Sequence, residues 1–168
     1  TPQDKSVSPL TDSRNNVRLA AVQALGRIRG KGAVEELLPL LKKTEILFVN
    51  KEEAARVLEI ETSDIEQLAS SFHALGVKTA VITDGPKGSY VSDQKNIYYL
   101  AIYPGKEVER TGAGDAYGSG FLAAIIHGKT IPEAMQWGNA NATSVVLYVG
   151  AREGLLEREA LEHMIAEF

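Results

Sequence analysis

The sequence predicts a three-layer α/β/α fold with a mainly parallel sheet. Two apolar segments, EILFV at 45–49 and TAVIT at 79–83, are typical of short strands buried on both faces. Helical segments separate and follow them, and this strand–helix–strand order favours a parallel sheet with right-handed crossovers. The chain has 168 residues, of which 44% are hydrophobic. That length and composition suffice for one domain with its own core.

The first 33 residues form a polar leader and one predicted helix. Apolar residues recur at helical spacing from Val17 to Ile28. Residues 11–43 also resemble a single HEAT-type helical repeat, through their Val-Arg-x-x-Ala, Ala-Leu-Gly-x-Ile and Ala-Val-x-x-Leu pieces. One such repeat cannot bury its own apolar face. A fusion to a helical interaction module therefore stays open for this segment.

The other predicted elements follow in order along the chain. Pro39 lies in the apolar run 34–43 and should bend or shorten that helix. The remaining predictions are helices at 51–58 and 64–76, strands at 88–93 and 96–104 joined by the turn SDQKN, and helices at about 114–127, 131–148 and 155–166.

The composition excludes several classes of function. The sequence has no cysteine, which rules out disulfides, zinc–thiolate sites and cysteine nucleophiles. A net charge of −4 does not favour nucleic acid as a partner. The apolar runs are too short to cross a membrane, and the polar start lacks the apolar stretch of a signal peptide. We therefore expect a cytoplasmic protein with neither a nucleic acid nor a membrane as partner.

A glycine-rich stretch, TGAGD at 111–115, lies between an extended segment and a helix. Small residues let backbone N–H groups approach an anion, and a helix N-terminus adds partial positive charge. Asp115 would repel an anion as a direct ligand, but it fits a base that takes a proton from a hydroxyl nucleophile. The alternative is a helix N-cap after a turn. Gly118 and Gly120 predict a helix that must stay slim beside a substrate or another helix.

The longer stretch VERTGAGDAYGSGF, residues 108–121, resembles the C-terminal signature of the ribokinase-like (PfkB) carbohydrate kinases. The resemblance implies that Asp115 is the catalytic base of a phosphoryl transfer. It also implies an anion hole made by the backbone of three residues, which are Gly112, Ala113 and Gly114.

The segment VNKEEA places Asn50 and Glu53 just after a predicted strand. Residues three apart at a helix start can share one face, and oxygen ligands suit Mg²⁺. The family resemblance implies that this Asn-x-x-Glu element supports Mg²⁺ and the phosphates of ATP. The alternative is a helix N-cap followed by a solvated acidic first turn.

Two further segments resemble nucleotide-binding parts of the family. VITDGPKGSYV matches its Thr-x-Gly-x-x-Gly turn, which implies that Thr83, Gly85 and Gly88 lie near the phosphates of ATP. NANATSVVLYVGA resembles the helix that lines the adenine pocket, with Asn139 and Gly150 as the residues carried over. The alternatives are a plain hairpin turn and a core helix rich in alanine and valine.

The resemblance covers about residues 34–168, which we interpret as the C-terminal, nucleotide-binding portion of a truncated ribokinase-like fold. It implies ATP- and Mg²⁺-dependent phosphoryl transfer to a hydroxyl of a sugar or nucleoside, although most of the acceptor site belongs to the half that does not match. A nucleotide-binding remnant without catalysis is the alternative. Unpaired apolar strands promote association, so we expect residues 14–42 or a second copy, as a homodimer, to cover the sheet edge.

Overall fold

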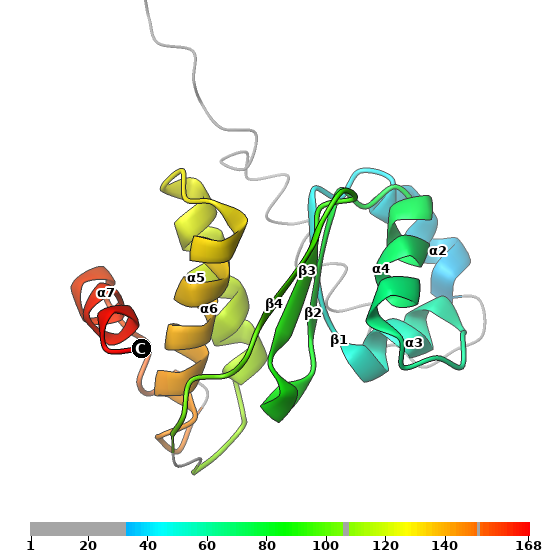
Figure 1. The fold of residues 1–168 in the computed structure, drawn as a ribbon. Coiled ribbons are helices and arrows are strands. Elements are labelled where there is room, and N and C mark those ends of the chain that lie inside the picture. The colour runs from blue at the N-terminus through cyan, green and yellow to red at the C-terminus, as the bar shows by residue number, and fades with distance from the viewer. Residues whose placement is uncertain (1–32, 106–107, 151) are drawn as a thin grey trace, which may run out of the picture.

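The computed structural model describes residues 33–105, 108–150 and 152–168. A four-stranded sheet is the middle layer, and Figure 1 shows helices on both of its faces. The predicted three-layer architecture is therefore confirmed. The described elements are α2 (Ala33–Leu41), β1 (Ile46–Asn50), α3 (Lys51–Leu58), α4 (Ile65–Ala74), β2 (Thr79–Thr83), the 3₁₀ turn η2 (Gly85–Lys87), β3 (Ser89–Ser92), β4 (Ile97–Leu100), α5 (Ala113–Ile126), α6 (Ile131–Val145) and α7 (Arg158–Ala166).

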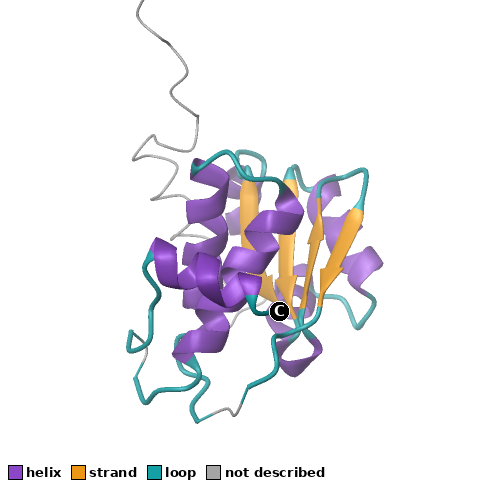
Figure 2. Ribbon diagram, turned by 60° about the vertical axis from the view of Figure 1, so that its left-hand side comes forward, coloured by secondary structure: helices purple, strands orange, loops and turns teal. Residues whose placement is uncertain are grey.

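The sheet has the order β1-β2-β3-β4, and it is mixed rather than mainly parallel (Figure 2). β1 and β2 are parallel, with Asn50 opposite Thr83 in the register. β2 pairs antiparallel with β3, and β3 with β4. The reason is the length of the connections: residues 84–88 and 93–96 are too few for a crossover, so each can only reverse the chain.

Several element boundaries differ from the sequence-based expectation. The second strand matches the prediction at 79–83, whereas β4 ends at Leu100, well before the predicted 104. α6 ends at Val145 and α7 begins at Arg158, so both helices are shorter than predicted. α2 ends at Leu41, two residues after Pro39, in line with the expected shortening. The helix predicted from Val17 to Ile28, and most of the HEAT-like stretch, lie outside the described residues.

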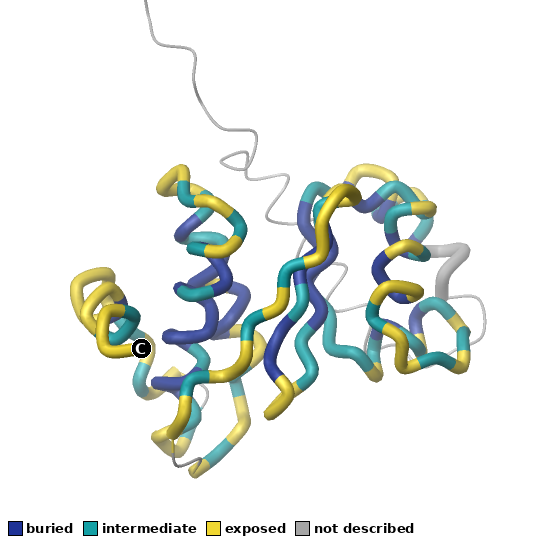
Figure 3. The backbone as a smooth tube through the Cα atoms, viewed as in Figure 1, coloured by how far each residue is buried: buried dark blue, intermediate teal, exposed yellow. Residues whose placement is uncertain are grey.

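Two clusters of buried apolar side chains fill the two faces of the sheet. Along β1 the side chains alternate, so Leu47 belongs to the cluster beneath α2, α3 and α4, while Phe48 belongs to the cluster beneath α5 and α6. Phe48 meets Phe121 of α5 edge to face, with ring centroids 5.4 Å apart. In Figure 3 the buried stretches concentrate in β1 to β3 and in the helices, whereas β4 alternates between exposed and half-buried.

Helices α5 and α6 pack with their backbones close together. A Cβ atom on Gly120 would lie 2.6 Å from the carbonyl oxygen of Trp137, and one on Gly138 would lie 2.9 Å from that of Tyr117. The expected slim helix is therefore found at Gly120. Gly118 differs, because a Cβ there would lie 3.7 Å from the Phe48 ring, which is an ordinary contact.

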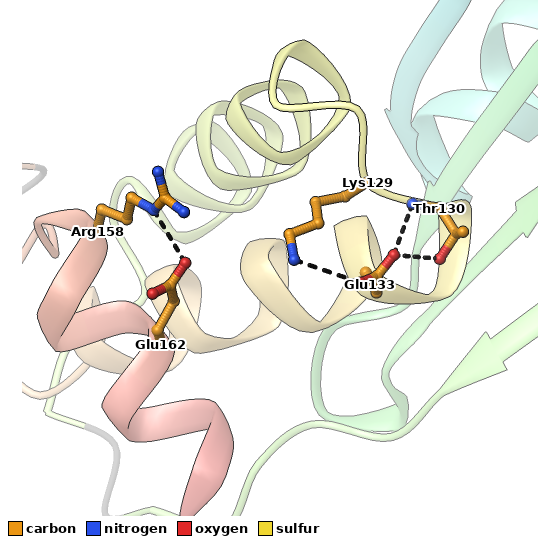
Figure 4. Close-up of polar contacts among 5 residues, drawn as sticks. All are labelled: Lys129, Thr130, Glu133, Arg158 and Glu162. Atoms are coloured by element: carbon orange, nitrogen blue, oxygen red, sulfur yellow. Dashed lines mark hydrogen bonds and ion pairs between the residues drawn. The ribbon is translucent and has the colours of Figure 1, made fainter.

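Figure 4 shows polar contacts at the start of α6 and an ion pair within α7. The Glu133 carboxylate accepts hydrogen bonds from the N–H (2.8 Å) and the hydroxyl (2.7 Å) of Thr130, and it pairs with Lys129 at 3.4 Å. These bonds, above all that from the Thr130 hydroxyl, lower the pKa of Glu133. Arg158 pairs with Glu162 one turn along α7, at 2.9 Å.

β1 lies at one edge of the sheet and, among the described residues, pairs only with β2. Leu37 and Leu41 of α2 belong to the cluster that contains Leu47, so α2 packs on the same face of the sheet as α3 and α4. The expected cover of the edge by residues 14–42 stays a prediction. The homodimer expected at this edge stays a prediction. In the part of the chain that the structure describes, no helix is both long and apolar enough to cross a membrane.

Candidate active site

The glycine-rich stretch folds as the predicted helix start. Gly112 is the N-cap of α5, with a φ of 85°, in the left-handed region that glycine adopts at little cost. Its carbonyl accepts the N–H of Ala116 at 2.8 Å, which begins the helical ladder. A Cβ on Gly114 would meet nothing within 4 Å. The backbone of this first turn is therefore open on one side.

The amides of this turn are not equivalent. The N–H of Ala113 donates to the carbonyl of Arg110 at 3.2 Å, so one of the three amides of the expected anion hole is engaged within the chain. Gly114 and Asp115 belong to the first turn, whose N–H groups have no intrahelical acceptor. Asp115 is the third residue of α5, and its side chain is exposed. A carboxylate there is favoured by the helix dipole.

A cavity of about 220 Å³ gathers site residues from three segments that lie far apart in the sequence. Six of the predicted site residues line it, namely Asn50, Glu53, Thr83, Gly112, Gly114 and Asp115. The rest of its wall is apolar, formed by Leu37, Leu41, Leu47, Phe48, Val49, Val57 and Phe72. The sequence motifs did not identify this apolar wall, because its residues have the pattern of ordinary core positions.

Asn50 and Glu53 form a reciprocal capping box at the start of α3. The side-chain oxygen of Asn50 accepts the N–H of Glu53 at 2.8 Å, and the Glu53 carboxylate accepts the N–H of Asn50 at 3.2 Å. The helix N-cap that the sequence allowed as the alternative for this motif is thus present. The bond to Asn50 uses one carboxylate oxygen of Glu53, and the residue still lines the cavity.

Magnesium fits this edge of the cavity only with few protein ligands. Among the described residues, no group of three or more His, Cys, Asp or Glu side chains could hold a metal ion. Mg²⁺ keeps several waters and is commonly held by one or two carboxylates together with substrate phosphates. Glu53, with one carboxylate oxygen outside the capping box, matches a Mg²⁺ site with few protein ligands.

The backbone geometry of the turn after β2 accounts for its two glycines. Gly85 and Gly88 have φ values of 51° and 96°, both in the left-handed region. A Cβ on Gly88 would lie 2.2 Å from the carbonyl oxygen of Leu100, so no side chain fits there. Thr83 lines the cavity, whereas Gly85 and Gly88 do not. The hairpin geometry accounts for both glycines without a ligand.

Asn139 and Gly150, the residues carried over for an adenine pocket, do not line this cavity. Asn139 is 5% exposed, and its amide donates to the carbonyl of Ala101 at 2.8 Å. The N–H of Gly150 donates to the carboxylate of Glu109 at 3.0 Å. Their part in binding a base stays a prediction.

Glu109 links two loops, a role that the sequence reasoning missed. Its carboxylate accepts hydrogen bonds from the Thr111 side chain and from the backbone of Gly150, and these bonds lower the pKa of Glu109. The N–H of Val108 also donates to the carbonyl of Val146 at 2.8 Å. The loop that leads into α5 is thereby tied to the segment after α6. The only sequence signal was a carboxylate two residues before the Thr-Gly pair.

Tyr117 anchors α5 to the sheet. Its hydroxyl lies 2.8 Å from that of Ser89 in β3, in a buried contact where either group can donate. Burial raises the pKa of Tyr117 to about 12, which keeps the phenol neutral. The helix that presents Asp115 is thus fixed two residues further along by a buried hydrogen bond.

These features together define an α/β protein with a candidate ligand site beyond the carboxyl ends of parallel strands, where open α/β sheets bind their ligands. Residues 15–158 match the pfkB family carbohydrate kinases, and the chain belongs to this family. The match begins within the segment 1–33 that the sequence analysis separated from the kinase-like part.

Individual relatives agree with the family. The chain is 30% identical to a ribokinase of Haemophilus influenzae, over 86% of this chain and 53% of the relative. It is 34% identical to a nucleoside kinase of Methanocaldococcus jannaschii, over 72% of this chain and 39% of the relative. An E. coli protein assigned as ribokinase II, solved in complex with ATP and Mg²⁺, superposes with a TM-score of 0.74 at 26% identity, over 81% of this chain and 44% of that one. The chain thus spans about half the length of these relatives, or less.

Proposed function

We propose that this chain supplies the ATP-binding and catalytic-base half of a kinase that transfers the γ-phosphoryl group of ATP to a hydroxyl of a sugar or nucleoside. The observation that carries the proposal is the cavity, which brings Asp115 and the start of α5 together with Asn50, Glu53 and Thr83. Each of these segments was singled out separately from the sequence. Family membership supports the same chemistry.

In this proposal Asp115 acts as the general base. The acceptor hydroxyl gives its proton to the Asp115 carboxylate, and its oxygen forms a bond to the γ-phosphorus of ATP. The bond from that phosphorus to the bridging oxygen breaks, and ADP leaves. The open first turn of α5 offers N–H donors and the positive end of the helix dipole to the charge on the transferring group.

Glu53 is the residue proposed to hold Mg²⁺, directly or through water, with Asn50 setting its orientation through the capping box. The ion, when bound, would neutralise charge on the phosphates of ATP. Support comes from the E. coli relative in complex with ATP and Mg²⁺.

The proposed acceptor class rests on relatives that are a ribokinase and a nucleoside kinase. Asn139 and Gly150 are kept as candidate residues for the adenine base, and a cytoplasmic location as a prediction.

The test is Mg·ATP binding and turnover with a panel of sugars and nucleosides, for wild type and Asp115→Asn. A matched control is Glu159→Gln, which neutralises an exposed carboxylate in the first turn of α7. We expect Asp115→Asn to bind Mg·ATP but to lose about 10²- to 10⁴-fold in kcat, the usual share of a general base. Equal rates for wild type and Asp115→Asn would remove Asp115 from the chemistry.

A second candidate function is nucleotide binding without catalysis. It is favoured by one observation: the chain spans only 53% and 39% of the two sequence relatives. Mg·ATP binding with no acceptor-dependent ADP formation in the wild type would select this alternative.

A further inference from the structure

We infer that the ion pair between Lys51 and Asp84 is a positioning pair, which sets the spacing between the two sides of the proposed nucleotide site. The inference rests on the proposed function. The register of the parallel strands places Asn50 opposite Thr83, so Lys51 and Asp84 are the next residue beyond each strand. The ammonium of Lys51 contacts the carboxylate of Asp84 across this gap. The pair therefore continues the link between β1 and β2 past the end of their backbone ladder.

The pair is sheltered from water, which makes it harder to break than a surface pair. The side chains of Lys51 and Asp84 are 17% and 12% exposed. The same two strands are bridged at their other end by Lys78 and Glu45, at 2.7 Å, where the side chains are 65% and 43% exposed. Exposed pairs contribute little, whereas removing one partner of a sheltered pair leaves an uncompensated charge. The sheltered pair lies at the carboxyl end, which is the end with the cavity.

Each partner also belongs to an element that carries site residues. Lys51 is the first residue of α3, where a positive charge opposes the helix dipole and so needs a counter-charge. Asp84 closes the turn after β2: its N–H donates to the carbonyl of Gly88 at 2.8 Å, and its carbonyl accepts the N–H of Lys87 at 3.0 Å. The pair thus joins the start of α3 to this turn.

Neither Lys51 nor Asp84 lines the cavity, whereas their neighbours Asn50 and Thr83 do. A role through these neighbours therefore fits better than direct contact with a nucleotide. If the pair is lost, α3 and the turn can shift apart, and displacements of about 1 Å in a binding site are enough to cost about a hundredfold in rate.

The experiment measures the Kd of Mg·ATP for the full chain with Lys51→Met, Asp84→Asn and the double variant. Glu45→Gln is the control that breaks the exposed pair between the same strands, and Lys51→Arg is the conservative variant. We expect each single variant to weaken binding at least about tenfold, the double variant to be no weaker than the singles, and Lys51→Arg and Glu45→Gln to bind as wild type.

Two results would overturn the inference in a chain that binds Mg·ATP. Tighter binding by Asp84→Asn, with weaker binding by Lys51→Met, would make Lys51 a direct phosphate ligand that Asp84 restrains. Wild-type affinity in all variants would leave the pair without a role in the site.

A second measurement keeps the inference separate from the proposed function. Amide hydrogen exchange of Asp84, Lys87 and Gly88 reports the turn without any ligand. We expect Asp84→Asn to speed exchange at Lys87 and Gly88 at least about tenfold relative to Glu45→Gln, with the amides of β2 unchanged. If the wild type binds no Mg·ATP, the proposed function fails, and this exchange result alone decides the positioning role. Equal exchange in both variants would refute it.

Discussion

Gly118 and Gly120 look alike in the sequence, yet the structure predicts opposite effects of alanine at these two positions of α5. Both glycines are buried in the interior of α5. Alanine has a helix propensity about 1 kcal/mol more favourable than glycine, and this term is common to both substitutions. At Gly118 the new Cβ would lie 3.7 Å from the Phe48 ring, so nothing needs to move. At Gly120 it would lie 2.6 Å from the carbonyl oxygen of Trp137 and 3.0 Å from its carbonyl carbon, both backbone atoms of α6.

The clash at Gly120 can be relieved only by moving α5 away from α6. Overpacking of this kind typically costs about 1–3 kcal/mol. Since the propensity gain is common to both variants, Gly120→Ala should be less stable than Gly118→Ala by about 1–3 kcal/mol. Gly118→Ala should match or slightly exceed the wild type.

The assay is urea denaturation of wild type and both variants, followed by circular dichroism. A lower midpoint for Gly120→Ala at an unchanged slope is the expected result. Equal midpoints for Gly118→Ala and Gly120→Ala would refute the close backbone packing of α5 on α6.

Three further predictions concern the site and its supports. Gly114→Ala should leave the unfolding free energy within about 0.5 kcal/mol of wild type or raise it, because the new Cβ meets nothing within 4 Å. In a titration it should nevertheless weaken Mg·ATP binding, because the methyl group narrows the open face of the first turn of α5. The pKa of Tyr117 is raised from 10.0 to about 12, so its contribution to stability is complete below pH 10 and falls as the pH rises toward 12. This alkaline loss of stability should be smaller in Tyr117→Phe. Identical pH profiles of the unfolding free energy in the two proteins would count against the buried phenol. The pKa of Glu109 lies below its ordinary 4.5, so its contribution to stability is present above pH 4.5 and is lost as the pH falls. Glu109→Gln should therefore lose less stability on acidification than the wild type. The same dependence of the unfolding free energy on acid pH in both proteins would argue against the link between the two loops.

The fold was predictable where local pattern decides it. The strands around 46–50 and 79–83 are continuous apolar runs, and the helix start at 112–115 has its glycine at the left-handed N-cap. The prediction of a mainly parallel sheet was wrong for the described residues, in which one strand pair is parallel and two are antiparallel. The proportion of parallel pairs in a sheet depends on which strands it contains. The described chain contributes one parallel pair and two hairpin connections.

Six residues singled out from the sequence line the cavity, but their arrangement was not predictable from the sequence. The motif around Asn50 and Glu53 allowed both a ligand site and a capping box. In the structure the two residues form the capping box and also line the cavity. The Lys51–Asp84 pair needs the register of β1 against β2, which no local pattern contains. The difference between Gly118 and Gly120 needs the position of α6.

The proposed phosphoryl transfer with Asp115 as the base is tested most directly by the rate of acceptor-dependent ADP formation by the full chain at saturating Mg·ATP, compared between wild type and Asp115→Asn. We expect turnover with a sugar or nucleoside in the wild type and a loss of about 10²- to 10⁴-fold in kcat in the variant, with the Kd of Mg·ATP unchanged. The absence of acceptor-dependent turnover in the wild type, or equal kcat in the two proteins, would contradict it.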